Sequence, residues 1–174
     1  MRARSLLAAS AVAASLALAL PPALAAAAPQ QAQSAPACRE AKVKLKVAKT
    51  DKPHVFRLTV RNDDVRACRI DRVPTITFGN LDGAAQPVSS ATSRTYTLAA
   101  GAKAHAKVRT IKRPGDPLAR TVRTVHVITE QRHRGTSFTA RTVSGTNRVT
   151  VYDPVTTWWH GTQGGADRQL NRAR

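Results

Sequence analysis

The chain has 174 residues and a formal net charge of +18, from 28 lysine and arginine residues against 10 aspartate and glutamate residues. Aromatic residues make up only 4% of it, and its single methionine stands at position 1. A Met-rich copper site is therefore excluded, and a broad aromatic surface for stacking nucleic-acid bases is disfavoured.

The first 25 residues have the pattern of a signal peptide. Two arginines precede an apolar run over residues 6–20, and the small residues Ala23 and Ala25 mark a cleavage site. The run is shorter than the roughly 20 residues that a membrane span needs. We therefore predict cleavage after residue 25, no transmembrane span in the mature chain, and a secreted, extracellular or cell-wall-associated protein. An uncleaved N-terminal anchor is the alternative, and lipidation of Cys38 is disfavoured because this residue lies far beyond the apolar run.

The composition divides the remainder into three parts. Residues 26–37 are rich in alanine, glutamine and proline and are predicted to be a disordered tether. Residues 38–159 are predicted to form one folded domain of ordinary size. Residues 160–174 hold glycine and charge with little to bury, so they are predicted to be a flexible basic tail.

The first half of the domain alternates apolar and polar residues. Segments 41–48, 54–62 and 75–78 have the period of two that is typical of half-buried strands, and residues 80–83 form a turn in which Gly83 takes a positive φ. Residues 94–110 predict two more strands around a turn at Ala99–Gly101. The side chains expected to face the core are those of Val43, Leu45, Val47, Phe56, Leu58, Val60, Ile76, Phe78, Tyr96, Leu98, Ala104, Ala106 and Val108.

The second half continues as strands. Residues 112–117 contain two prolines and a glycine and predict a loop, whereas residues 120–130 are rich in β-branched residues and predict a strand with Val125 and Val127 inward. Residues 136–143 are expected to return antiparallel to it, and residues 148–154 form a last strand. No window beyond the signal peptide has a helical period. The sequence therefore predicts an all-β fold, an antiparallel β-sandwich of seven to nine strands.

The two cysteines, Cys38 and Cys68, indicate a disulfide bond. Two cysteines in an exported chain of this size pair more often than they act separately. A thiolate nucleophile would need a positioned base and a metal site would need histidines at ligand spacing, and neither pattern is present. Closing a loop of about 30 residues should stabilise the domain by roughly 3–4 kcal/mol.

Cys38, the stretch "FRLTVRNDDVRACRIDRVPTITF" and the stretch "YTLAAGAKAHAKV" together have a pattern of an early cysteine, a strand that ends at an asparagine and leads to a second cysteine, and a later L-x-x-G-x-x-A. In this pattern the chain resembles a family of secreted actinobacterial domains of unknown function. Asn62, Cys68 and Pro74 match its first part and Gly101 its second, although Ala100 replaces the usual proline. The resemblance covers residues 38–152. It implies an immunoglobulin-like β-sandwich and export, and it implies no activity.

The positive charge has two interpretations. It either reflects a high arginine content spread over a solvated surface, or it attracts polyanions such as anionic cell-wall polymers, lipid headgroups or nucleic acid. Nucleic acid is the least favoured partner, because most of the seven aromatic residues are expected in the core. The strands predict a basic sheet face, and residues 131–135 predict a basic loop. The candidate contact residues are Lys42, Lys44, Lys46, Arg57, Arg61, Arg132 and Arg134.

Two adjacent tryptophans, Trp158 and Trp159, point to opposite sides of an extended chain. One of them is expected to close the core. The other either lies along the surface or contacts a glycan, a lipid interface or a protein partner.

No motif in the sequence indicates a catalytic activity. A phosphate-binding glycine loop, a G-x-S-x-G elbow and an H-E-x-x-H helix are missing from the sequence, and the acidic residues fall mostly in predicted turns. We therefore expect no enzyme, cofactor or metal. The favoured hypothesis is an exported, non-catalytic binding or structural module that associates with anionic cell-envelope material. A protein–protein interaction module that uses Trp158 and Trp159 is the alternative, and an uncharacterised enzyme is the third.

Overall fold

The computed structural model describes residues 35–173, and this part of the chain is all-β with few helices. The all-β class that the sequence predicts is confirmed, whereas the predicted signal peptide (1–25) and most of the predicted tether (26–37) lie outside the described residues. The strands are β1 (Val43–Lys49), β2 (Val55–Asn62), β3 (Cys68–Asp71), β4 (Thr75–Phe78), β5 (Gln86–Pro87), β6 (Thr95–Leu98), β7 (Lys103–Arg109), β8 (Arg120–Val122), β9 (Thr124–Ile128), β10 (Thr136–Thr139), β11 (Val149–Val151) and β12 (Val155–Thr156). The helices are the 3-10 turn η1 (Glu40–Lys42), α1 (Ala140–Ser144) and α2 (Gln163–Arg172).

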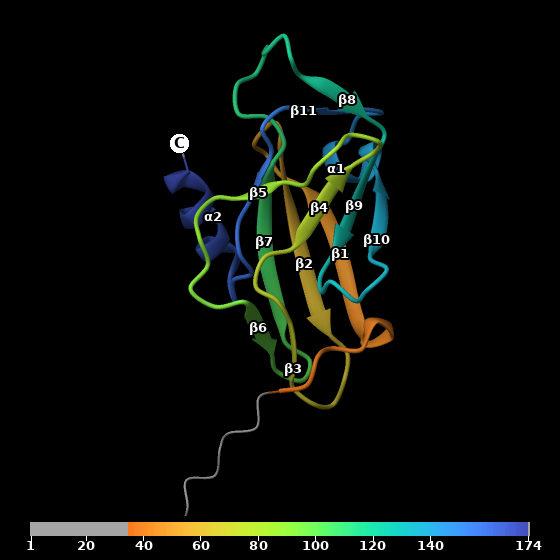
Figure 1. Cartoon of the computed structure of the whole chain (residues 1–174), viewed down its shortest axis with the longest axis vertical. Coiled ribbons are helices and arrows are strands. Elements are labelled where there is room, and N and C mark those ends of the chain that lie inside the picture. The colour runs from red at the N-terminus through yellow and green to blue at the C-terminus, as the bar shows by residue number, and fades with distance from the viewer. Residues whose placement is uncertain (1–34, 174) are drawn as a thin grey trace, which may run out of the picture. The chain divides into compact units, whose positions relative to one another are not determined.

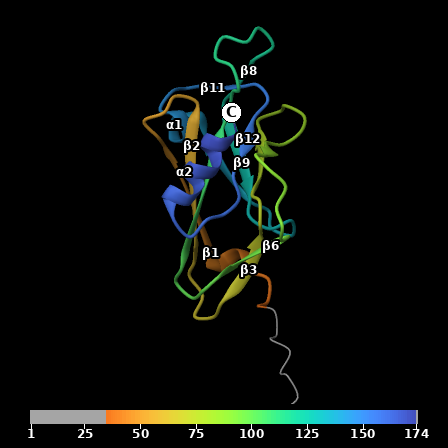
Figure 2. The ribbon, with the colours of Figure 1, turned by 90° about the vertical axis from the view of Figure 1, so that its left-hand side faces the viewer.

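The strands form one large sheet and three small ones. The large sheet has the order β1-β2-β7-β12-β5, a three-stranded sheet has the order β10-β9-β4, and β11-β8 and β3-β6 are two-stranded. Among the described strands every pairing is antiparallel except that of β12 with β5. In Figures 1 and 2, β3 and β6 lie at one end of the molecule and β8 and β11 at the other.

One hydrophobic core joins the sheets. The inward side chains of β2 and β7 pack with those of β4 and β9, and all are 2% exposed or less, as the alternation predicted. The inward side chains of β1 and Tyr96 are partly buried against the same core. Gly83 has a φ of +85°, as the predicted turn requires.

The number and extent of the strands differ from the prediction. Twelve strands over residues 35–173 replace the expected seven to nine, because several pairings involve only two or three residues. The expected strand over 120–130 is broken at Arg123, where the chain leaves β11 and joins β4 and β10. The expected strand over 136–143 ends at Thr139, whose side chain accepts a hydrogen bond from the backbone N–H of Thr142 and so caps helix α1.

The prediction of a flexible tail over residues 160–174 is wrong. Residues 163–172 form α2, which packs on β7, as Figures 1 and 2 both show. Thr162 caps the helix by accepting a hydrogen bond from Gly165, and Ala166 and Leu170 are buried. The helix is polar over most of its surface, and its contacts with the sheet hold it in place.

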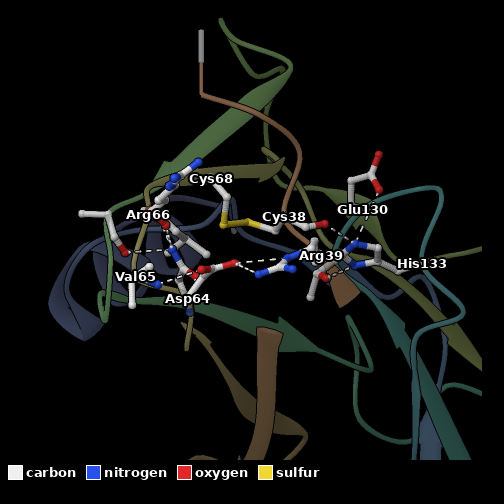
Figure 3. The surroundings of a disulfide bond; sticks show 12 residues. Cys38, Arg39, Asp64, Val65, Arg66, Cys68, Glu130 and His133 are labelled. Atoms are coloured by element: carbon white, nitrogen blue, oxygen red, sulfur yellow. Dashed lines mark hydrogen bonds and ion pairs between the residues drawn. A yellow bond between two sulfur atoms is a disulfide. The ribbon is translucent and has the colours of Figure 1, made fainter. Parts of the chain in front are cut away.

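The disulfide bond between Cys38 and Cys68 is present, as predicted, with a Cα–Cα distance of 4.8 Å. Its geometric origin differs from the expected pairing of antiparallel neighbours. Residues 36–38 run parallel to the start of β3: the backbone N–H of Cys38 donates to the carbonyl oxygen of Arg69, and the N–H of Arg69 donates to that of Pro36. Figure 3 shows the ion pair of Arg39 with Asp64 beside the bond and His133 beyond Arg39. Hydrogen bonding to Arg39 lowers the pKa of Asp64.

Asn62 ends β2 and holds the loop that leads to Cys68. Its side chain is fully buried, and its amide nitrogen lies 2.8 Å from the carbonyl oxygen of Arg66 and 3.2 Å from those of Leu98 and Ala99. Its amide oxygen accepts from the backbone N–H of Asp64 at 2.9 Å. One side chain thus satisfies backbone groups from two segments, residues 64–66 and residues 98–99.

We predict that Cys38→Ala combined with Cys68→Ala lowers the free energy of unfolding by about 3–4 kcal/mol, because the unfolded chain regains the entropy of the closed loop. Denaturant unfolding of the wild-type protein, with and without reductant, and of the double variant measures this effect. A loss below about 1 kcal/mol would show that this loop is already restricted in the unfolded chain.

Asn62→Ala is predicted to lower the free energy of unfolding by roughly 2–4 kcal/mol, because it leaves buried carbonyl groups without a donor. Asn147 is exposed and accepts one hydrogen bond from Arg141, so Asn147→Ala is the control. That control should change stability by no more than about 0.5 kcal/mol. Equal effects of the two variants in the same denaturant titration would refute the role assigned to Asn62.

Candidate functional site

The register of β1, β2 and β7 places basic side chains on the outer side of the large sheet. Lys44 pairs with Arg61 and Arg61 with Lys103, so three cations lie in one row across the strands. A second row holds Lys46, Thr59 and His105, and a third holds Ala48, Arg57 and Lys107. Arg109 follows on β7. We define the cationic face as Lys44, Lys46, Arg57, Arg61, Lys103, His105, Lys107 and Arg109.

These cations lie close together because of strand geometry. Directly opposite side chains on paired strands have Cβ atoms about 4.5–5.5 Å apart, and like charges in that position repel. Successive outward residues of one strand are separated by roughly 7 Å, which is twice the rise per residue. The arrangement is therefore a grid of positive charge that destabilises the free fold.

Acidic residues neutralise only part of the grid. Asp63 lies 3.0 Å from the Nε of Arg61, and Asp167 of α2 pairs with Lys107. Among residues 35–173, no carboxylate lies within ion-pair distance of Lys44, Lys46 or Lys103. The β1 side of the face thus carries positive charge without an ion-pairing partner in the described structure.

A groove of about 410 Å³ lies over this side of the face. Lys44, Lys46, Arg57, Arg61 and Lys103 line it together with the small or polar residues between them, and Asp63 is the one acid in its lining. The groove supplies lysine ammonium groups and arginine guanidinium groups that can donate to several anionic oxygens at once. It can therefore bind an anion.

His105 lies within the grid, between Arg57 and Lys103. Its Nδ1 is 3.1 Å from the hydroxyl of Thr59. Burial lowers the pKa of His105, and the charges of Arg57 and Lys103 lower it further. The imidazole is therefore neutral at pH 7 and gains charge only under more acidic conditions.

The structure brings together four of the seven predicted basic contact residues: Lys44, Lys46, Arg57 and Arg61. Lys42 lies in η1 and not on the strand, because its backbone N–H donates to the carbonyl oxygen of Arg39 and so closes the 3-10 turn. Arg132 and Arg134 lie in the loop between β9 and β10, on the other sheet, where Arg132 pairs with Glu130.

Sequence reasoning missed the β7 part of the face. The outward residues Lys103, His105, Lys107 and Arg109 alternate with the predicted inward residues of the same strand, and this alternation could have identified them. The pairing of β7 with β2 could not be read in the same way, because the nearest strand in sequence, β6, pairs with β3.

Trp159 is fully buried and cannot contact a partner, which corrects its place among the candidate residues. Trp158 is half-buried and already engaged. Its indole N–H donates to the carbonyl oxygen of Ser89 at 3.0 Å, and the guanidinium of Arg72 lies over its ring at 5.3 Å. Its ring also stacks on that of His160. These contacts make Trp158 part of the packing around α2.

The described residues contain neither a metal-binding cluster nor a membrane-spanning helix. Within residues 35–173, no group of three or more histidine, cysteine, aspartate or glutamate side chains is placed to hold a metal ion. In the same range, no helix has the length and apolar character needed to cross a bilayer.

The fold and the face define a small all-β domain with one disulfide bond and a cationic sheet surface. Residues 38–159 match the model of a family described as a domain of unknown function (DUF4232), and the chain belongs to this family. No curated protein and no solved structure gives a significant match.

The position of His105 predicts a pH dependence of stability. The unfolded chain has an ordinary histidine pKa near 6.5, so below that pH it takes up a proton before the folded state does. Lowering the pH from about 7.5 to 5.5 should therefore reduce the free energy of unfolding, and His105→Gln should reduce this loss. Denaturant titrations at both pH values measure it.

His54→Asn serves as the control, because His54 is exposed and asparagine tolerates its positive φ of 59°. This control should lose as much stability as the wild type over the same pH range. An identical loss in the His105→Gln variant would show that His105 does not titrate as its surroundings imply.

Proposed function

We propose that this protein is an exported, non-catalytic binding module with an immunoglobulin-like β-sandwich fold, and that it binds anionic polymers of the cell envelope through the cationic face. A leader-like N-terminus and a disulfide bond support export, since such bonds persist in oxidising compartments. The two faces of the large sheet suit this role, because one supplies the core and the β1 side of the other is open to a ligand.

The groove with its paired rows of cations carries the proposal. A fold gains nothing from placing Lys44, Arg61 and Lys103 directly across from one another, since their repulsion opposes folding. An anion that binds among them relieves this repulsion and forms charge-assisted hydrogen bonds. Anion binding is thus the event that turns this unfavourable arrangement into a favourable one.

A linear polymer fits this face better than a lipid surface. Among residues 35–173, the large hydrophobic side chains that are exposed are Val65 and Leu118, and neither lies in the groove. Membrane-bound surfaces usually add apolar or aromatic side chains to their basic residues. The outward cations repeat along and across the strands, so an extended chain of phosphate or carboxylate groups can engage several of them together.

The test compares Lys44→Glu/Lys46→Glu with the wild-type protein in binding to inorganic polyphosphate. We expect the affinity to fall at least tenfold at low salt, because two cations of the groove become anions. The slope of log affinity against log salt should fall in magnitude by about 2, since each lost phosphate contact removes close to one released counterion.

The matched control is Arg113→Glu/Arg123→Glu, which changes the net charge equally at exposed positions outside the groove. It should retain most of the affinity. Equal losses in the two variants would mean that net charge alone drives adsorption, and absence of binding by the wild type would refute the proposal. Tighter binding to phosphatidylglycerol vesicles than to polyphosphate would show that the cationic face binds a membrane surface and not a polymer.

A further inference from the structure

Helix α2 covers one side of the cationic face and contacts it through oxygen atoms. The carboxylate of Asp167 pairs with Lys107, whose side chain is only 9% exposed. The side-chain oxygen of Gln163 accepts from Arg57 at 2.6 Å, and the carbonyl oxygen of Ala173, just after the helix, accepts from Arg109 at 2.8 Å. Each of these acceptors meets a cation of the sheet.

The guanidinium of Arg109 is incompletely satisfied. Its Nη2 donates to the carbonyl oxygen of Ala173, but its Nε is buried and has no hydrogen-bond partner among the described residues. A guanidinium accepts an anion best when two of its N–H groups donate to two oxygens of the same group. The single carbonyl oxygen of Ala173 therefore leaves the Nε–H donor of Arg109 unused.

The apolar contacts that hold α2 are few, and Gln169 adds hydrogen bonds with the backbone N–H of Trp158 and the ring of His160. Gly164 and Gly165 occupy its first turn, where glycine disfavours the helix, and Ala166 and Leu170 are its buried residues. A helix of ten residues is marginal in water without tertiary contacts. The helix also lies beyond the residues that match the family model, which end at position 159.

We propose that Arg57, Lys107 and Arg109 form a second anion subsite, adjoining the open groove, which α2 fills with its own oxygen atoms and vacates when a polyanion binds. This inference rests on the proposed function and extends it. Asp167, Gln163 and the carbonyl of Ala173 stand where the phosphate or carboxylate oxygens of the polymer bind. Because the helix and the polymer share the same donors, the closed helix lowers the apparent affinity for the polymer.

Hydrogen exchange of the wild-type protein tests displacement directly. Inorganic polyphosphate should accelerate exchange of the backbone amides of residues 163–172, while it protects those of β2. A helix that only supports the fold predicts unchanged or slower exchange in α2 on binding. That result would overturn the second subsite.

Asp167→Asn tests the competition by affinity, because it removes the one charge with which α2 holds the face. We expect polyphosphate to bind about threefold to tenfold more tightly, with a steeper salt dependence as Lys107 joins the contact. Asp153→Asn is the matched control, since it removes an acid that pairs with Lys112 outside the face. Equal affinities of the two variants would contradict the proposal.

A chain that ends at Gly161 provides a further comparison. If it folds, it should bind polyphosphate at least as tightly as Asp167→Asn; if it does not fold, the exchange and Asp167→Asn measurements decide. If the wild-type protein binds polyphosphate, but α2 shows no faster exchange and Asp167→Asn binds no more tightly, the second subsite alone is refuted. A wild-type protein that does not bind polyphosphate removes both this inference and the proposed function.

Discussion

The antiparallel register of β1, β2 and β7 is the constraint on which the rest of the structure depends. Because side chains alternate between the two faces of a strand, the register that buries Leu58 against Ala106 also sets Arg61 opposite Lys44 and Lys103. A shift of one residue would bring the cations into the core and the apolar side chains into water, so burial of the inner face fixes the outer one. The hydrophobic effect therefore positions the cationic face, although it acts on the opposite side of the sheet.

The hydrogen bonds of Asn62 and the disulfide bond between Cys38 and Cys68 maintain that register at one end of the sheet. Asn62 stops β2 directly after Arg61, and its hydrogen bonds join the following loop to the residues before β7. Cys68 then ties the start of β3 to the segment before β1. The three strands of the cationic face thus begin or end at points that are held by buried polar or covalent links. These links matter because the part of the outer face that α2 does not cover contributes repulsion and little packing of its own.

The local part of this architecture was predictable and the non-local part was not. Alternation along one strand identified both the buried side chain of Leu58 and the exposed side chain of Lys46, since it depends only on backbone geometry. The partner of β7 is decided by which surfaces fit across the core, so the sequence did not show that Lys103 would meet Arg61. Helix α2 is a stronger example of an element that the sequence alone does not predict. Its composition predicts a solvated tail, and only docking against the sheet, with Leu170 buried and Asp167 beside Lys107, makes it a helix.

The same electrostatic imbalance explains why α2 docks on the cationic face and why a polyanion can compete with it there. A face with more cations than anions attracts whatever negative or oxygen-rich group is tethered nearby, and residues 163–173 are joined to β12 by a short connection. That attraction is not specific to a helix, because a charge-assisted hydrogen bond requires only an anionic oxygen within reach. A polymer that carries many such oxygens can occupy the open rows first and then compete for Lys107 and Arg109 at a high effective concentration. The arrangement that draws α2 onto the sheet is therefore also the one that allows a polyanion to replace it.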